Sequence, residues 1–149
     1  MTYSGMPVLL RKHLNEWDGL TGDIIGAAIE VHRELGPGLL ESAYEECLAE
    51  ELRLRRIDFA RQVAIPALYR GRALDCGYRV DFIIGPVAVE LKAVEHLLPV
   101  HRAQVLTYLR LKRLRCGLLI NFNVPVLYEG IVRLLGPEVS APPRLRGSQ

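Results

Sequence analysis

Cysteine is scarce in this 149-residue chain, and the three that occur, Cys47, Cys76 and Cys116, are widely spaced. An odd number of cysteines, with no Cys-x-x-Cys pair and no Cys/His cluster, argues against a disulfide framework and against a zinc site. No apolar run approaches the roughly 18 residues of a membrane span, and the N-terminus lacks the apolar segment of a signal peptide. The sequence therefore predicts a cytoplasmic protein with reduced thiols and no membrane association.

A strong excess of charge is also missing, since the formal net charge is +2 and the pI is about 8.5. This mild basicity permits nucleic acid as a partner without requiring it. Half of the residues are hydrophobic, enough for one core. We expect a lead-in over residues 1–18, a single domain over 19–137 and a disordered, Pro-containing tail over 138–149.

Helical periodicity marks the first part of the domain. Apolar residues follow the N-cap types Thr21 and Asp23 at helical spacing, and Gly36-Pro37-Gly38 ends this helix. A second helix is predicted over about 39–55, with an apolar stripe of Leu40, Tyr44, Cys47, Leu48 and Leu52.

A charged hairpin over 78–92 is the most informative segment. Two apolar runs flank the turn signal Gly85-Pro86, and a turn centred there places Asp81 opposite Glu90. Side-chain alternation puts Asp81, Glu90 and Lys92 on one face. The other face is then apolar throughout, with Val80, Phe82, Ile84, Val87, Val89 and Leu91.

The charges on this hairpin have two interpretations. Like charges directly opposite each other on paired strands are destabilising, so a structural hairpin would avoid Asp81 facing Glu90. Two converging carboxylates suit Mg²⁺, and Lys92 beside them suits an attacking water or a developing anion. The alternative is an edge hairpin with a solvated charged face.

The remaining elements complete an α/β pattern. A strand over 63–69, with Pro66 indicating an edge position, turns at Arg70-Gly71 into the strand that leads to Asp81. Pro99 opens a helix, and the apolar run 118–122 is expected as a buried strand parallel to its neighbour. A last strand or helix covers 127–135. The order predicts a sandwich of helices around a mixed sheet.

Several motifs carry a resemblance to known families. Gly38, Glu41 and Tyr44 form the pattern G-x-x-E-x-x-Y, and the chain resembles the GxxExxY protein family over roughly 20–135. The segments 89–94, 98–104 and 117–125 extend the resemblance. The spacing of Asp81 from Glu90-x-Lys92 is similar to that of the PD-(D/E)xK nuclease superfamily, which implies a restriction-endonuclease-like α/β sandwich with a mixed central sheet.

The resemblance implies a metal-dependent nuclease acting on nucleic acid, with DNA favoured. Mg²⁺ or Mn²⁺ would be bound by Asp81 and Glu90, by the backbone carbonyl of Leu91 and by Glu41 directly or through water, while Lys92 would act in catalysis. Glu41 could instead be an ordinary acidic residue of a first helical turn. Glu45 is the fallback for it.

A Q-x-x-x-Y pair, Gln104 and Tyr108, follows the Glu-x-Lys strand and resembles one nuclease branch in which the pair contacts DNA backbone or orders the site. The alternative is a surface Gln with a half-buried Tyr. His96 and His101 are expected to be solvated loop residues. Basic side chains that could flank phosphates are Arg79, Arg102, Arg110 and Lys112.

Two further functions stay open from the sequence. One is a non-catalytic module on the same fold that binds nucleic acid or protein, and the other is an interaction protein whose charged face binds a partner. The choice between DNA and RNA, the position of cleavage and the oligomeric state are not fixed by the sequence.

Overall fold

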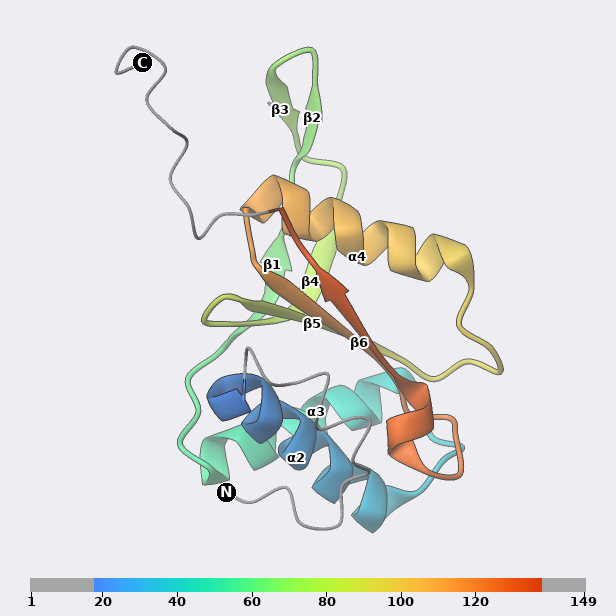
Figure 1. Ribbon diagram of the computed structural model, residues 1–149. Helices are drawn as coiled ribbons and strands as arrows, with labels where there is room; N and C mark the ends of the chain where they lie inside the picture. The colour runs from blue at the N-terminus through green and yellow to red at the C-terminus, as the bar shows by residue number, and fades with distance from the viewer. Residues whose placement is uncertain (1–17, 138–149) are drawn as a thin grey trace.

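The computed structural model describes residues 18–137, drawn in colour in Figure 1. The predicted tail over 138–149, and the predicted lead-in apart from its last residue, lie outside the described residues. None of the helices within the described residues is long and apolar enough to cross a membrane.

Two helices open the fold. Helix α2 spans Asp18–Leu35 and α3 spans Glu41–Leu54, joined by a loop in which Gly36 and Gly38 have φ angles of 70° and 97°. These left-handed conformations suit glycine, which has no Cβ to clash with the backbone. The predicted helix end at Gly36-Pro37-Gly38 is therefore confirmed.

A mixed five-stranded sheet forms the centre of the molecule, in the order β1-β4-β5-β6-β7. Its strands are β1 (Ala60–Ala64), β4 (Arg79–Ile84), β5 (Val87–Lys92), β6 (Cys116–Asn121) and β7 (Ile131–Leu135). Neighbours pair antiparallel except β5 and β6, which run parallel. Helix α4 (Pro99–Lys112) makes the crossover between them.

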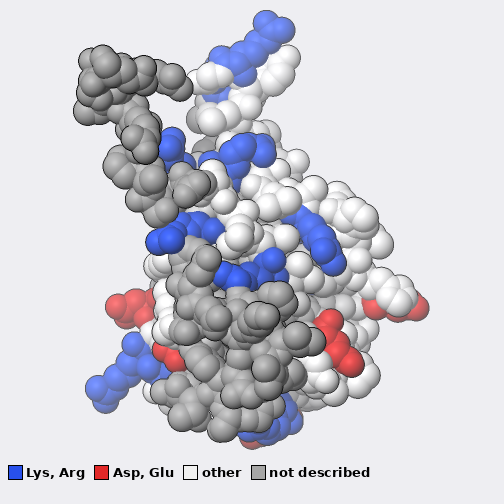
Figure 2. All heavy atoms as spheres, in the orientation of Figure 1, with Lys and Arg blue, Asp and Glu red and all other residues white. Residues whose placement is uncertain are grey.

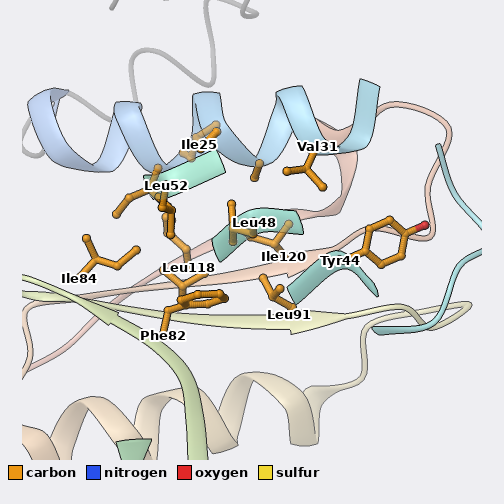
Figure 3. Packing of buried hydrophobic residues seen from close by; sticks show 14 of the residues in the cluster. Ile25, Val31, Tyr44, Leu48, Leu52, Phe82, Ile84, Leu91, Leu118 and Ile120 are labelled. Carbon is orange, nitrogen blue, oxygen red and sulfur yellow. The ribbon is translucent and has the colours of Figure 1, made fainter. Parts of the chain in front are cut away.

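The helices cover the two faces of this sheet, with α2 and α3 on one side and α4 on the other (Figure 1). The larger core lies between the helix pair and the sheet, where Leu48 and Leu52 of α3 meet Phe82, Leu91 and Leu118 of the strands (Figure 3). The smaller core lies under α4. The predicted helix–sheet–helix sandwich is confirmed.

One predicted strand is divided in two. The segment 63–69 was expected to be continuous, but β1 ends at Ala64 and β2 covers only Ala67–Tyr69. Pro66 lies in the break, where its missing N–H cannot interrupt a ladder. The predicted edge position holds for β1, the first strand of the sheet.

A small hairpin follows the break. Strand β2 pairs with β3 (Arg72–Leu74) around Arg70 and Gly71, as a sheet separate from the main one. The hairpin projects from the body beyond α4 (Figure 1). The expected single strand from Arg70-Gly71 to Asp81 is therefore wrong, since 75–78 are irregular and β4 starts only at Arg79.

The last segment contains both of the elements that the sequence left open. A 3-10 helix, η2, covers Leu127–Gly130 and leads directly into β7. Strand β6, entirely buried, is parallel to β5, as predicted from its apolar run.

Candidate active site

Two carboxylates meet where β4 and β5 separate. The ladder runs from Ile84–Val87 to Phe82–Val89, which is the predicted register. At the next position, the backbone N–H of Asp81 donates to the Glu90 carboxylate at 3.0 Å, and the N–H of Leu91 donates to the Asp81 carboxylate at 2.8 Å. Side chains therefore replace main-chain partners at this end of the hairpin.

The strand β4 changes face at Asp81. Phe82 packs in the core under α2 and α3, whereas Val80, two residues earlier, packs in the core under α4. In a regular strand these two side chains would lie on one face. The prediction that Val80 belongs to the apolar face of the hairpin is wrong, while the other five members lie in the larger core as expected: Phe82, Ile84, Val87, Val89 and Leu91.

Gln62 of β1 lies opposite Asp81, the point at which β4 changes face, and sequence reasoning missed it. It lies between the pairs Arg61–Phe82 and Val63–Val80 and has a φ of 50°, a left-handed conformation that is costly for a residue with a Cβ. Its side-chain amide donates to Asp81 at 3.1 Å and to Glu45 of α3 at 2.8 Å.

Burial raises the pKa of both central carboxyl groups. Asp81 and Glu90 are 8% and 6% exposed, so the charged forms lose hydration. The pKa of Glu90 is raised to about 8, first by burial and then by the negative charge of Asp81. The pKa of Asp81 is raised as well, again chiefly by burial. A cation placed between the two carboxyl groups would favour the ionised form of each.

Lys92 supplies positive charge to the same place. It follows Leu91 at the end of β5, is partly exposed, and makes no ion pair with any residue of the described range. Its charge lowers the pKa values of Asp81, Glu90 and Glu41 against the effect of burial. The predicted trio of Asp81, Glu90 and Lys92 is thus brought together.

The family model of the PD-(D/E)XK nuclease superfamily matches residues 18–134. The chain belongs to the PD-(D/E)XK nuclease superfamily. No curated protein and no solved structure gives a significant match to the chain. The narrower GxxExxY grouping remains a resemblance.

The side chains of the site provide some of the ligands that the superfamily's divalent metal ions need. Asp81 and Glu90 offer hard oxygen donors, and burial raises the pKa of both, so a nearby cation would favour their ionised forms. Within residues 18–137, however, no three His, Cys, Asp or Glu side chains are grouped closely enough to hold an ion. The two carboxylates fit a hard cation that completes its shell with backbone oxygen, water and substrate.

Glu41 and Glu45 differ in their availability to such an ion. Glu45 accepts hydrogen bonds from Arg61 at 2.7 Å and from Gln62 at 2.8 Å, so its oxygens are occupied. Glu41, at the start of α3, makes no hydrogen bond within the described residues. Its pKa is raised by burial and by the charges of Asp81 and Glu45, which places it in the field of the site. The structure brings Glu41 near the carboxylate pair without direct contact.

Tyr44, the last residue of the G-x-x-E-x-x-Y pattern, fixes the loop that precedes Glu41. Its hydroxyl donates to the carbonyl of Gly36 at 2.6 Å and accepts from the N–H of Leu39 at 3.1 Å. Its ring stacks on Phe122, with centroids 4.5 Å apart. The tyrosine therefore fixes the α2–α3 loop, and with it the first turn of α3.

Asn121 holds the segment that leaves the site after Lys92. Its side-chain amide donates to the carbonyl of Val94 at 2.9 Å and accepts from the N–H of the same residue at 3.0 Å. The N–H of Phe122 donates to the Lys92 carbonyl at 2.9 Å. The 117–125 motif thus braces the end of β5.

Gln104 and Tyr108 lie on α4, one helical turn apart, and line a common cavity. Tyr108 is only 3% exposed, more deeply buried than in the alternative of a surface Gln with a half-buried Tyr, whereas Gln104 is partly exposed. Their contact with substrate stays a prediction.

The two histidines have different surroundings. His96 is solvated in its loop, as expected. His101 is instead in the first turn of α4, where its Nδ1 accepts the N–H of Leu98 at 3.0 Å, so the loop assignment is wrong for it.

Proposed function

We propose that the protein is a metal-dependent nuclease that hydrolyses phosphodiester bonds of nucleic acid, with DNA as the favoured substrate and Mg²⁺ or Mn²⁺ as the cofactor. One observation carries the proposal: two buried carboxylates with raised pKa values lie beside a lysine that makes no ion pair within residues 18–137, where β4 and β5 separate in a PD-(D/E)XK fold. A purely structural site would not leave two acids and a lysine there without direct ion pairs.

The roles of the side chains follow from their positions. Asp81 and Glu90 would hold the ion with the Leu91 carbonyl, and Glu41 would join through water. The bound metal supplies polarisation of the phosphoryl oxygen and a lowered pKa of water. A cation held there would favour the ionised form of Glu90, whose pKa is otherwise raised by burial and by the charge of Asp81. Lys92 would position the attacking water or stabilise the negative charge that develops on the phosphorus oxygens.

The test is cleavage of labelled DNA and RNA, single-stranded and double-stranded, across a titration of Mg²⁺ and Mn²⁺ and in EDTA. Cleavage is expected with either metal and not with EDTA. Lys92→Ala and Lys92→Met are expected to lose turnover and to retain the wild-type melting temperature within about 1–2 °C. Asp58→Asn, which changes an exposed aspartate outside the site, serves as the control for purification and handling.

Two results would overturn the proposal. One is the absence of cleavage of any substrate with either metal by a folded protein. The other is full activity of Lys92→Ala. Binding of nucleic acid without cleavage would favour the non-catalytic module instead.

A further inference from the structure

A cavity of about 380 Å³ lies between α4 and the chain segment that connects β1 to β4. Its walls include Ile65, Tyr78 and Ala67 on one side and Gln104, Tyr108 and Leu111 on the other. Cavities that bind small molecules occupy about 300–1,000 Å³, with apolar walls and a few polar groups. The volume is therefore at the small end of that range, suitable for a single ring system and its immediate attachment.

The cavity is close to the carboxylates. Tyr78 precedes Asp81 by three residues, which corresponds to about 10 Å of extended chain. Tyr108, on the opposite wall, has a pKa raised to about 12 by burial and by the negative charges of Glu90 and Asp81. A ligand in the cavity would therefore lie close to the two carboxylates.

Polar side chains at the cavity are few, and two of them, Gln104 and His101, keep groups free for a ligand. The Gln104 amide makes no hydrogen bond within the described residues, so it can both donate and accept. The Nδ1 atom of His101 accepts a hydrogen bond from Leu98, which leaves Nε2 as the donor in the neutral ring. Such a donor–acceptor set matches the edge of a heterocyclic base, and the half-exposed ring of Tyr78 offers a surface for stacking.

The surroundings of the cavity are basic. Helix α4 contains no acidic residue and presents Arg102, Arg110 and Lys112 to solvent, while the β2–β3 hairpin adds Arg70 and Arg72. Figure 2 shows lysine and arginine gathered over the half of the molecule that holds α4 and this hairpin. This charge favours a phosphate-bearing ligand over an apolar peptide or lipid chain.

We infer that the cavity beside α4 receives an unpaired nucleobase of the strand whose backbone passes Asp81 and Glu90. The inference rests on the proposed function and narrows it to DNA with an unstacked nucleotide near the cleaved bond. Tyr78, whose ring is half exposed, stacks on the base, Tyr108 forms the buried wall of the cavity, and Gln104 bonds the edge of the base. A fully paired duplex keeps its bases in the stack and cannot use the cavity.

The experiment measures binding rather than cleavage, with the full chain carrying Lys92→Ala in Ca²⁺. Fluorescence anisotropy compares a duplex with one unpaired nucleotide, the same duplex with an abasic residue at that position, and the fully paired duplex. Stacking of one base on aromatic side chains corresponds to about 5- to 150-fold in affinity. We expect the abasic and paired duplexes to bind at least about fivefold more weakly than the duplex with the unpaired base.

Substitutions in the cavity wall identify the residues that discriminate between the unpaired and abasic duplexes. Tyr78→Ala removes a half-exposed ring from the cavity wall and is expected to abolish the discrimination, while Tyr78→Phe retains it. Tyr69→Ala is the matched control, because this exposed tyrosine lies on the hairpin and does not line the cavity. Gln104→Ala is expected to reduce the preference among the four bases, and Gln104→Glu to change it.

Equal binding of the unpaired and abasic duplexes would overturn the inference, as would discrimination that survives Tyr78→Ala. These results are distinguishable from failure of the proposed function. A protein that cleaves DNA but ignores the abasic change has the nuclease activity without the base cavity. A protein that prefers the unpaired base but never cleaves, as wild type in Mg²⁺ or Mn²⁺, has the cavity without the activity. Absence of binding to all of the DNAs overturns the inference as well.

Discussion

The Glu90 carboxylate accepts the backbone N–H of Asp81, the residue that faces it across the hairpin. In turn, the Asp81 carboxylate accepts the N–H of Leu91, the residue after Glu90. Each acid is therefore held by the main chain of the opposite strand, in a position where their charges repel. The backbone N–H groups orient the two carboxylates without neutralising them.

The first prediction concerns pH. The folded-state pKa of Glu90 is about 8, against an ordinary 4.5, so between these values the folded protein holds a proton that the unfolded chain has released. The free energy of unfolding should fall as pH rises through this window, by an amount on the order of a few kcal/mol. Asp81, whose pKa is also raised, adds to the same trend.

Thermal unfolding in EDTA from pH 5 to 8.5 measures this trend. Glu90→Gln, which cannot ionise, should show a clearly shallower decline than wild type. Glu34→Gln, at an exposed position of α2, is the matched control and should follow the wild-type curve. Parallel curves for wild type and Glu90→Gln would contradict the prediction.

The second prediction concerns metal binding. Wild type should melt higher in millimolar Mg²⁺ or Mn²⁺, because a ligand that binds only the folded state stabilises it by mass action. Asp81→Asn should lose most of the rise with metal, because one of the two charged ligands is gone. Asp58→Asn should keep that rise. A destabilised Asp81→Asn that retains the full rise would show that the carboxylates do not share an ion.

The third prediction concerns Gln62. Gln62→Ala loses the hydrogen bonds to Asp81 and Glu45 and keeps a left-handed backbone, so it should be destabilised by about 1–3 kcal/mol. Gln62→Gly loses the same bonds but adopts φ = 50° without strain, and should be more stable than Gln62→Ala by roughly 1 kcal/mol. Chemical denaturation measures both, and an alanine variant equal to or more stable than the glycine variant would argue against strain at this position.

The fourth prediction concerns Tyr44. Tyr44→Phe retains the stack on Phe122 and loses the hydroxyl that joins Gly36 to Leu39, which should cost about 1–2 kcal/mol of unfolding free energy. Because this loop sets the start of α3, nuclease activity should also fall while the metal-induced rise in melting temperature, which depends on Asp81 and Glu90, persists. Loss of that rise would mean that Tyr44 acts on the carboxylate pair directly.

Local chemistry predicted much of this architecture. Gly85-Pro86 set the hairpin and its register, because a two-residue turn leaves little freedom in how the strands pair. The glycines of the α2–α3 loop ended the first helix, and the apolar run of β6 identified a buried parallel strand. These features depend on neighbours in sequence or on burial.

The features that escaped prediction depend on distant contacts. A glutamine with positive φ in a strand has no sequence signal, since glycine or asparagine would be expected there. The face change of Val80 lies beside that irregularity in the neighbouring strand, and alternation within β4 alone could not reveal it. The preference for Glu41 over Glu45 was expected, but the hydrogen bond from Arg61 that occupies Glu45 joins residues distant in sequence and had no sequence signal.

The hairpin of β4 and β5 also bears on the order in which the chain assembles. Asp81, Glu90 and Lys92 are joined through one tight turn, whereas the parallel pairing of β5 with β6 has to wait until α4 closes a long loop. Short loops close at a lower entropic cost and sooner than long ones. The acids and the lysine of the candidate site are thus carried by the most local contact of the sheet, and the two acids would meet in the earliest structured states of the chain. A divalent ion present during refolding should therefore increase the folding rate as well as the final stability.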